Sequence, residues 1–519
     1  MAEKKRKSLF QKFLDGVEKA GNALPHPVTI FFILCVIVMI ISHICYKAEV
    51  AVNFTKIAKN DAGVYEAKDT IVSVVSLLTP DGIRYMFENA VTNFTGFAPL
   101  GTVLVAMLGV GVAEGTGLIS TLIRKLVLST PKSLITAVVV FAGIMSNVAS
   151  DAGYIVLIPL GALIFASFKR NPLAGIAAAF AGVSGGFSAN LIIGTIDPLL
   201  GGISTEAAKM IDPTYTVGPM ANWAFMFVST FLITILGTLV TEKIVEPRLG
   251  EYKGNSAEIK LDKISKEEKR GLLFAGIAFL LFIGALCLLL IPANGILRNP
   301  ETGEILGHSP FMNGIVFIIM LFFLIPAVGY GVGSGTIKND KQIVSAMSKA
   351  MASMGGYLVL AFAASQFIAY FNYTQLGTVL AVKGAAFLEA LKFKGLPLIV
   401  AFVLLSGFIN LFMGSASAKW AIMAPVFVPM FMKLGFSPEL TQVAYRIGDS
   451  STNIISPLMS YFAFIVTTAQ VYDEESGIGT LISMMLPYTL IFLLGWTVLL
   501  IVWYLLGFNL GPGAPLFFG

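Results

Sequence analysis

Four of the charged side chains inside the long apolar segments of the chain lie at breaks in those segments: Asp197, Lys419, Arg446 and Asp449. Each such charge at a helix centre costs about 2.5–3.5 kcal/mol to insert into a membrane. Together the four would cost roughly 10–14 kcal/mol, which rivals the net stability of a whole domain. They must therefore be paired, hydrated or bound to a ligand. Their grouping at breaks in the apolar segments favours a binding site.

Arg446 and Asp449 are three residues apart, so a helix places them on one face. One interpretation is a salt bridge between them. In the other, Arg446 is a fork for a substrate carboxylate and Asp449 takes up Na⁺ or a proton. Asp449 opens a run of hydroxyl and amide side chains that ends at Asn453, and Pro457 interrupts the helical hydrogen bonds that follow. Oxygen ligands of this kind suit a small cation, and protonation of Asp449 is the competing possibility.

Further candidates lie near the other breaks. Asp197 precedes a proline, and its carboxylate either borders the site or caps a helix that begins at that proline. Asn410 either supplies a carbonyl oxygen to a cation or bridges two helices. Trp420 either stacks on an aromatic ligand or is an ordinary buried tryptophan. Glu114 and His43 each stand alone in apolar segments, which favours a packing or lipid-interface role for both.

The elements that hold these residues are membrane helices. Of 519 residues, 56% are hydrophobic and 13% charged, whereas soluble domains carry about 25% charged residues. The net charge of +5 is spread over loops, which gives no basis for nucleic-acid binding. Three cysteines in apolar runs and three unpaired histidines disfavour a disulfide framework and a zinc site. We therefore expect no cofactor and no metal beyond a possible Na⁺.

Nine apolar segments are long enough to cross a bilayer, which takes roughly 20 residues. They run near 27–46, 96–122, 172–203, 217–241, 271–292, 310–333, 350–372, 438–469 and 480–507. Two further stretches, 133–168 and 396–433, are too long for one crossing and are broken near the middle by small and polar residues. A broken stretch that returns to its own side is a re-entrant hairpin. The sequence predicts an all-α polytopic membrane protein with about nine transmembrane helices and two opposed re-entrant hairpins.

Flanking Lys and Arg residues orient this arrangement. Residues 1–25 are expected to form a cytoplasmic amphipathic helix, and the basic segment 242–270 a cytoplasmic loop. The first transmembrane half, 27–241, contains hairpin 133–168 and broken helix 172–203, and the second half, 271–519, contains hairpin 396–433 and broken helix 438–469. The segment from Lys47 to Glu88 is expected outside, polar and partly helical.

The two halves repeat each other. With an offset of 266 residues and no gap, Pro159 aligns with Pro425, Pro172 with Pro438, Gly182 with Gly448, Ser184 with Ser450, and Tyr154 with Trp420. Five predicted crossings separate the hairpins, and because five is odd the second copy is inverted. Inverted repeats with broken helices are typical of secondary transporters, whose site lies near the membrane midplane where the breaks meet.

Four motifs together resemble the AbgT family: Ser146-Asn-Val-Ala-Ser-Asp-Ala-Gly-Tyr154, Gly194-Thr-Ile-Asp-Pro-Leu-Leu200, Gly414-Ser-Ala-Ser-Ala-Lys-Trp420 and Tyr445-Arg-Ile-Gly-Asp-Ser-Ser-Thr-Asn453. The resemblance covers nearly the whole chain. It implies a homodimer of nine-helix protomers in the bacterial inner membrane, each with a basin that opens to the cytoplasm. The implied substrates are p-aminobenzoyl-glutamate and, by efflux, sulfonamide antimetabolites.

The resemblance also implies roles for single residues. Substrate-pathway positions match Asp197, Trp420, Pro438, Arg446, Asp449 and Pro457, with Ser417 as a further candidate at a hairpin tip. Positions linked with the cation match Asn410 and Asp449, and we add Asn147 and Asn453 as candidate cation ligands.

Residues and resemblance together predict a cation-coupled (Na⁺ or H⁺) secondary transporter that works by alternating access and is not an enzyme. Its partners are a small-molecule substrate, membrane lipid and a second copy of the chain. A dicarboxylate transporter of the same superfamily is the alternative, although a succinate-like substrate gains nothing from Trp420. An intramembrane aspartyl enzyme using Asp197 and Asp449 is disfavoured because Arg446 stands where such proteases carry a glycine. A passive channel would have little use for two hairpins.

Overall fold

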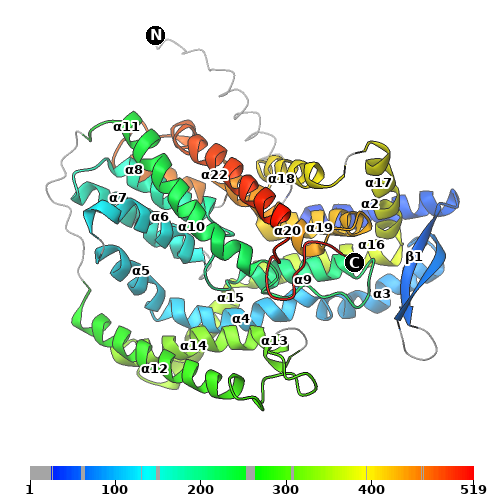
Figure 1. The fold of residues 1–519 in the computed structure, drawn as a ribbon, viewed down its shortest axis with the longest axis horizontal. Coiled ribbons are helices and arrows are strands. Elements are labelled where there is room, and N and C mark those ends of the chain that lie inside the picture. Colours follow the sequence, from blue (N-terminus) through cyan, green and yellow to red (C-terminus); the bar gives the residue numbers. More distant parts are fainter. Residues whose placement is uncertain are drawn as a thin grey trace, which may run out of the picture.

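The computed structural model describes residue 25 and residues 27–59, 65–129, 131–147, 152–252, 264–305, 309–392, 394–456, 459 and 461–518. The helices are α2 (Pro27–Lys47), α3 (Pro80–Thr95), α4 (Ala98–Gly115), α5 (Leu118–Leu128), α6 (Ile135–Ser146), α7 (Ala152–Ser167), α8 (Pro172–Phe180), α9 (Ile196–Ala208), α10 (Trp223–Val240), α11 (Glu246–Leu249), α12 (Lys266–Leu290), α13 (Pro310–Asn313), α14 (Ile315–Ser334), α15 (Asp340–Ser353), α16 (Gly355–Tyr373), α17 (Leu376–Ala390), α18 (Leu396–Asn410), α19 (Ala416–Lys433), α20 (Pro438–Asn453), α21 (Phe462–Gln470) and α22 (Ile478–Leu506) (Figure 1). Short turns are η1 (Lys132–Leu134), η3 (Ala181–Gly185) and η4 (Thr241–Val245). The predicted helical membrane fold is confirmed.

Within the described residues, six helices are long and apolar enough to cross a membrane, or seven if α15 and α16, bent by 45°, form one span. These seven fall on seven of the nine predicted crossings. The other two predicted crossings, 172–203 and 438–469, each consist of two shorter helices joined by non-helical chain. The number of crossings stays a prediction, because each broken segment would have to cross the bilayer as two joined halves.

The first repeat is α6, α7 and the broken helix α8–α9. Helix α8 begins where Asn171 Oδ1 accepts a hydrogen bond from Leu173 N at 3.0 Å, with Pro172 in the first turn. It continues into the π-helical turn η3 and ends at the Gly185-Gly186 pair. Helix α9 starts ten residues later at Ile196. The chain between them is unwound at the position where the sequence predicts a break.

The broken helix of the second repeat begins with the same features, a side-chain cap and a proline in the first turn. Helix α20 begins where Ser437 Oγ accepts from Leu440 N at 3.1 Å, again with a proline, Pro438, in the first turn. Ser437 lies 266 residues after Asn171, so the cap follows the offset of the repeat. Helix α20 ends at Asn453, and α21 resumes at Phe462.

Gly182 and Gly448, which the repeat aligns, both allow a neighbouring helix to approach closely. A Cβ atom on Gly182 would lie 2.3 Å from the carbonyl oxygen of Val140 on α6. One on Gly448 would lie 2.3 Å from the carbonyl oxygen of Val403 on α18. In each repeat, therefore, only glycine lets the first hairpin arm pack backbone to backbone on the broken helix.

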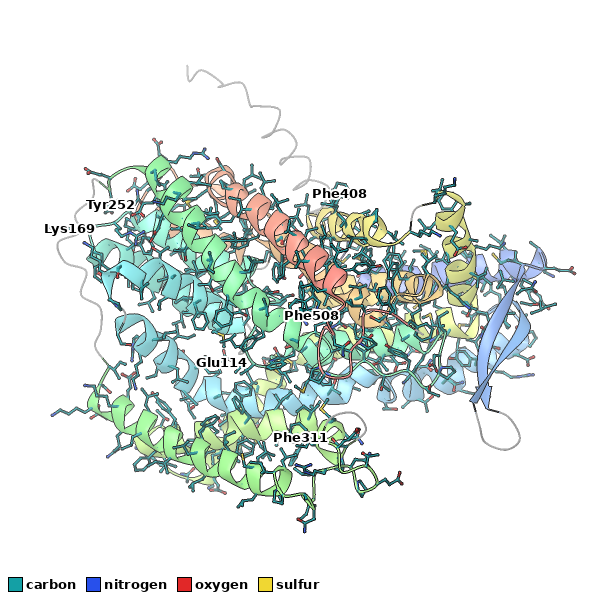
Figure 2. All side chains as sticks on the ribbon, viewed as in Figure 1. Glu114, Lys169, Tyr252, Phe311, Phe408 and Phe508 are labelled. Carbon is teal, nitrogen blue, oxygen red and sulfur yellow. The ribbon has the colours of Figure 1, made fainter. Side chains whose placement is uncertain are left out.

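The two hairpins open at opposite ends of the molecule (Figure 1). The arms α6 and α7 join the chain at the end where α11 lies, and Arg170 just after α7 bonds Glu246 of α11 at 2.5 Å. Lys169 and Tyr252 mark the same end in Figure 2. Helix α18 instead begins beside α17, on the side of the sheet (Figure 1). Whether each hairpin is re-entrant in a bilayer stays a prediction.

The outer elements differ from the sequence-based expectation in two places. The segment after α2, expected to be polar and partly helical, contains a two-stranded antiparallel sheet, β1 (Ala51–Lys59) and β2 (Tyr65–Ser73), paired from Ala51 with Ser73 to Lys59 with Tyr65. Helix α17 was not predicted, because its 15 residues are too few for a crossing. The predicted amphipathic helix at 1–25 falls almost entirely outside the described residues, as do Asp151, Pro457 and residues 253–263 of the basic loop.

A layer of α4, α12, α14 and α15 lies beside the two repeats (Figure 1). Helix α4 packs closely on α14, because Gly109 would place a Cβ atom 2.0 Å from the carbonyl oxygen of Met320. Large apolar side chains face outward from this layer and from the repeats, among them Leu280 on α12 and Phe408 on α18 (Figure 2). Such faces suit contact with lipid.

Candidate functional site

Arg446 and Asp449 of α20 pair with residues of other elements and not with each other. Arg446 Nη1 lies 2.7 Å from Asp197 Oδ1 on α9. Lys419 Nζ on α19 lies 2.5 Å from Asp449 Oδ1. All four residues are buried. Arg446 and Asp449 thus each have a partner elsewhere in place of the salt bridge considered from the sequence, and the charges of these two pairs cancel inside the protein.

Asp197 lies in the first turn of α9 and not at its cap, which is Thr195. The interpretation of Asp197 as an N-cap is therefore wrong. Its Oδ2 atom accepts a hydrogen bond from Gly194 N at 2.7 Å, while Oδ1 faces Arg446. A carboxylate in the first helical turn is favoured by the helix dipole. Asp197 borders the site through its ion pair.

The guanidinium of Arg446 is almost fully engaged. Nη2 donates to the carbonyl oxygen of Ser188 at 2.9 Å, and Nη1 approaches Asn222 Oδ1 at 3.5 Å. Nε is buried and has no partner among the described residues. A substrate carboxylate that reaches this fork would have to replace Asp197.

The ammonium of Lys419 sits in a cage of oxygen atoms. It donates to Asn410 Oδ1 and to Asp449 Oδ1, and the carbonyl oxygen of Met413 lies at 3.5 Å. A carboxylate, an amide oxygen and a carbonyl are also ligands for a small inorganic cation. In this structure these three oxygen atoms surround the ammonium group of Lys419.

Asn410 links α18 to α20 through its other end. Its Nδ2 atom lies 2.7 Å from the carbonyl oxygen of Asp449, 2.9 Å from Thr452 Oγ1 and 2.8 Å from Asn453 Oδ1. Asn410 therefore bridges two helices, and its amide oxygen accepts a hydrogen bond from the Lys419 ammonium; binding of an inorganic cation by Asn410 stays a prediction. Asn453 takes part as an acceptor of this bridge.

Several buried oxygen atoms of the first repeat have no partner among the described residues: Asn147 Oδ1, Ser188 Oγ and Asn190 Oδ1. Ser451 Oγ on α20 is in the same state. A buried polar atom without a partner costs free energy unless water or an ion satisfies it. Asn147, at the end of α6, keeps its place as a candidate cation ligand on this ground.

Trp420 is fully buried, with both its polar edge and one face occupied. Its Nε1 atom donates to Ser204 Oγ at 3.0 Å, and its ring stacks on Tyr445 with 4.5 Å between centroids and 27° between planes. In this conformation, an aromatic ligand could stack on Trp420 only after the contact with Tyr445 has opened.

Two other predicted residues have plain structural positions. Ser417 lies in the first turn of α19 at the tip of the second hairpin, with Oγ 3.4 Å from Ser415 Oγ. Pro438 lies in the first turn of α20, where its fixed backbone favours the helix start. Among the described residues, neither Ser417 nor Pro438 forms a hydrogen bond with the side chains of the four charged residues.

The two repeats exchange contacts at matched positions. Tyr154 on α7 stacks on Tyr461, in the break of the second repeat, with 4.7 Å between centroids and 8° between planes. Trp420 on α19 bonds Ser204 on α9, in the broken helix of the first repeat. Because Tyr154 and Trp420 are aligned by the repeat, each hairpin reaches the broken helix of the opposite repeat. The four charges lie where the repeats meet.

A neutral hydrogen-bonded chain beside the ion pairs was missed from the sequence. Ser204 Oγ donates to Gln442 Oε1 at 2.6 Å, and Gln442 Nε2 donates to Asn222 Oδ1 at 2.8 Å. Asn222 Nδ2 donates to the carbonyl oxygen of Glu439 at 3.0 Å. The available signal was helical periodicity, since Gln442 precedes Arg446 by four residues, which places both side chains on one face of α20.

Comparison with known proteins gives a consistent result. Residues 12–518 match the family model described as the AbgT putative transporter family. The chain is 41% identical over 502 residues to the p-aminobenzoyl-glutamate transport protein of Escherichia coli K12, covering 97% of this chain and 96% of that protein.

Two solved structures are similar over nearly the whole chain. The Alcanivorax borkumensis YdaH transporter superposes with a TM-score of 0.87 at 48% identity, covering 94% of this chain and all of that one. Neisseria gonorrhoeae MtrF, described among antimetabolite efflux pumps, superposes with a TM-score of 0.89 at 49% identity, covering 97% and 100%. These proteins are transporters or pumps, which agrees with the expectation that the chain is not an enzyme. The fold, the motifs and these matches show that the chain belongs to the AbgT family of transporters.

Proposed function

We propose that the protein is a cation-coupled secondary transporter of p-aminobenzoyl-glutamate and of sulfonamide-type antimetabolites. The observation that supports this most is the group of two buried ion pairs where the inverted repeats meet. The relative named for p-aminobenzoyl-glutamate transport and the structure described among antimetabolite efflux pumps support the choice of substrate.

The chemistry of the two ion pairs suits exchange of partners. A substrate carboxylate competes with Asp197 for Arg446, and Na⁺ or a proton competes with the Lys419 ammonium for Asp449. One exchange alone leaves the displaced Asp197 or Lys419 without its partner, at a cost of several kcal/mol for an unpaired buried charge. Both exchanges together release a carboxylate and an ammonium, which have opposite charges. Coupling then follows because one bound carboxylate and one bound cation together keep this group of charges neutral, whereas either one alone does not.

Movement of the core is the second part of the proposal. The hairpins open at opposite ends, and each contacts the broken helix of the other repeat. A shift of the repeats against the layer of α4, α12, α14 and α15 would expose the site to one side at a time, as alternating access requires.

The setting of the transporter is proposed from charge and exposure. The basic segment 242–270 and the mouth of the first hairpin, joined by Arg170 and Glu246, are placed on the cytoplasmic side of the inner membrane, together with the N-terminus. A homodimer is proposed from the resemblance. Light scattering of the purified protein in detergent tests it, and a monomer mass would contradict it.

Flux of radiolabelled p-aminobenzoyl-glutamate into proteoliposomes, under Na⁺ and pH gradients imposed separately, tests the function. We expect accumulation driven by one of the gradients and competition by a sulfonamide. Accumulation of succinate in its place would favour the dicarboxylate alternative. No flux above that of empty liposomes would contradict the proposal.

The role of Trp420 has its own test. Trp420→Ala is expected to weaken binding of p-aminobenzoyl-glutamate more than binding of free glutamate, because only the first ligand has a ring to stack. Calorimetric titration of the purified protein measures both. Equal losses would remove Trp420 from the substrate pathway as a stacking partner.

A further inference from the structure

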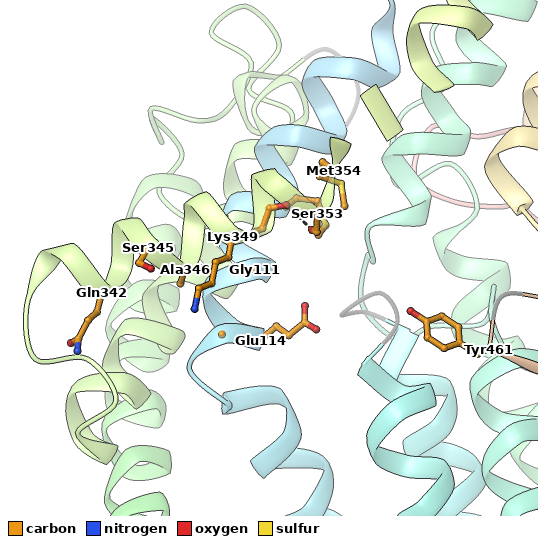
Figure 3. A pocket seen from close by; sticks show the side chains of 12 residues that line it. Gly111, Glu114, Gln342, Ser345, Ala346, Lys349, Ser353, Met354 and Tyr461 are labelled. Carbon is orange, nitrogen blue, oxygen red and sulfur yellow. Dashed lines mark hydrogen bonds between the residues drawn. The ribbon is translucent and has the colours of Figure 1, made fainter. Parts of the chain in front are cut away.

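A cavity of about 610 Å³ lies apart from the four buried charges, between α4, α15 and the break that follows α20. This volume falls within the range of about 300–1,000 Å³ that is typical of small-molecule sites. The side chains of interest in its lining are Glu114 on α4, Lys349 on α15 and Tyr461 (Figure 3). Glu114 is exposed and lines this cavity, so its side chain is not packed in the interior, and a role at the lipid interface stays a prediction.

Close packing of α4 on α15 brings Glu114 and Lys349 into the lining of the same cavity. A Cβ atom on Gly111 would lie 2.1 Å from Ala350 Cβ, and one on Gly115 would lie 3.3 Å from Ala346 Cβ. Two small residues on α4, four apart, thus face two alanines on α15, four apart, which lets the helices approach closely. Glu114 and Lys349 stand next to these contact positions in the sequence, so both side chains emerge at the rim of the same contact.

Tyr461 supplies the opposite wall of the cavity (Figure 3). Its ring is stacked on Tyr154 of the first hairpin, so the wall is an aromatic pair that joins the two repeats. Helix α4 also packs against α9, which carries Asp197. The cavity therefore borders both the outer layer and the elements that hold the buried charges.

We propose that this cavity is the site where the substrate first binds in this conformation, a step that rests on the proposed function. The Lys349 ammonium takes a carboxylate of the glutamate part, the Glu114 carboxylate accepts a hydrogen bond from the aromatic amine, and the aromatic ring lies against Tyr461. The ligand class is an aromatic amine joined to an amino acid. The buried charges act in a later step, because Trp420 and Arg446 are about 0–1% exposed here.

Calorimetric titration of the detergent-purified protein with p-aminobenzoyl-glutamate tests the site. Lys349→Gln is expected to weaken binding about threefold to tenfold, while Lys349→Arg stays within about twofold of the wild type. Lys341→Gln, on the same helix but outside the cavity lining, is the matched control and is expected to leave binding unchanged. Tyr461→Leu is expected to weaken binding about twofold to tenfold and Tyr461→Phe to preserve it.

A second ligand isolates Glu114. Benzoyl-glutamate lacks the amine, so the wild type is expected to bind it severalfold more weakly than p-aminobenzoyl-glutamate. Glu114→Gln is expected to reduce that preference. An unchanged preference, or unchanged binding in Lys349→Gln and Tyr461→Leu while the wild type still transports, would overturn the site and leave the proposed function standing. Absence of both binding and flux in the wild type would overturn the two together.

Discussion

Removal of one charge of the buried pair of Lys419 and Asp449 should destabilise the protein more than removal of both charges. Two unit charges 2.5 Å apart, as in the pair of Lys419 and Asp449, attract by about 6–7 kcal/mol at an effective dielectric constant of 20. Burial of the two ions opposes most of that attraction, so the net worth of the intact pair is small. Lys419→Met, however, leaves the Asp449 carboxylate buried with only the hydroxyl of Tyr445, 3.4 Å away, as a side-chain donor among the described residues. Loss of one partner of a buried pair costs about 3–5 kcal/mol.

Asp449→Asn is the matched variant: it leaves the Lys419 ammonium without its opposite charge, although the new amide oxygen can still accept a hydrogen bond from that ammonium. Melting temperatures of the detergent-purified proteins, followed by tryptophan fluorescence, give the comparison. We expect Lys419→Met and Asp449→Asn each to melt below the wild type, and the double variant to recover most of the loss. A Lys419→Met protein that melts like the wild type, or a double variant as unstable as Lys419→Met, would refute the reasoning.

Three further predictions concern packing, capping and charge geometry. Gly448→Ala would place a methyl group 2.3 Å from a backbone oxygen of α18 and is expected to destabilise the protein by about 1–3 kcal/mol. Gly276→Ala, where a methyl group would meet open space, should not lower the melting temperature. Equal melting temperatures of the two variants would contradict the packing argument. Ser437→Ala removes the cap of α20 and should cost about 0.5–2 kcal/mol, seen as faster amide hydrogen exchange in the first turn of that helix, and unaltered exchange would argue against the cap. Arg446→Lys keeps the charge but loses the fork, so substrate flux in proteoliposomes should fall at least about tenfold, and wild-type flux would show that a point charge suffices.

The general form of the site could be predicted from the sequence. Insertion energies alone required Asp197, Lys419, Arg446 and Asp449 to be neutralised, and the structure neutralises them with one another. The offset of the repeat located the broken helices, because prolines at helix starts and glycines at close contacts are fixed by backbone geometry. These requirements are local, so they can be recognised from the residue types at particular positions of the sequence.

The choice of partners could not be predicted. Spacing on α20 made Arg446 and Asp449 neighbours, but the second hairpin brings Lys419 and the broken helix of the first repeat brings Asp197 to pair with them. The hydrogen-bonded chain through Ser204, Gln442 and Asn222 was not predicted for a similar reason. Neutral polar residues cannot be assigned to a hydrogen-bonded chain until tertiary contacts show which of them are neighbours. The sheet after α2 and the short helix α17 lie outside the apolar pattern on which the crossings were assigned.

Gradient-driven uptake of radiolabelled p-aminobenzoyl-glutamate by proteoliposomes that contain Asp449→Asn tests most directly whether the buried ion pairs couple transport to a cation. Asp81→Asn, at a carboxylate that is 81% exposed, is the control. We predict that Asp449→Asn loses accumulation under both Na⁺ and pH gradients, while it still exchanges labelled for unlabelled substrate without a gradient, and that Asp81→Asn behaves like the wild type. Accumulation at the wild-type level in Asp449→Asn would contradict the account.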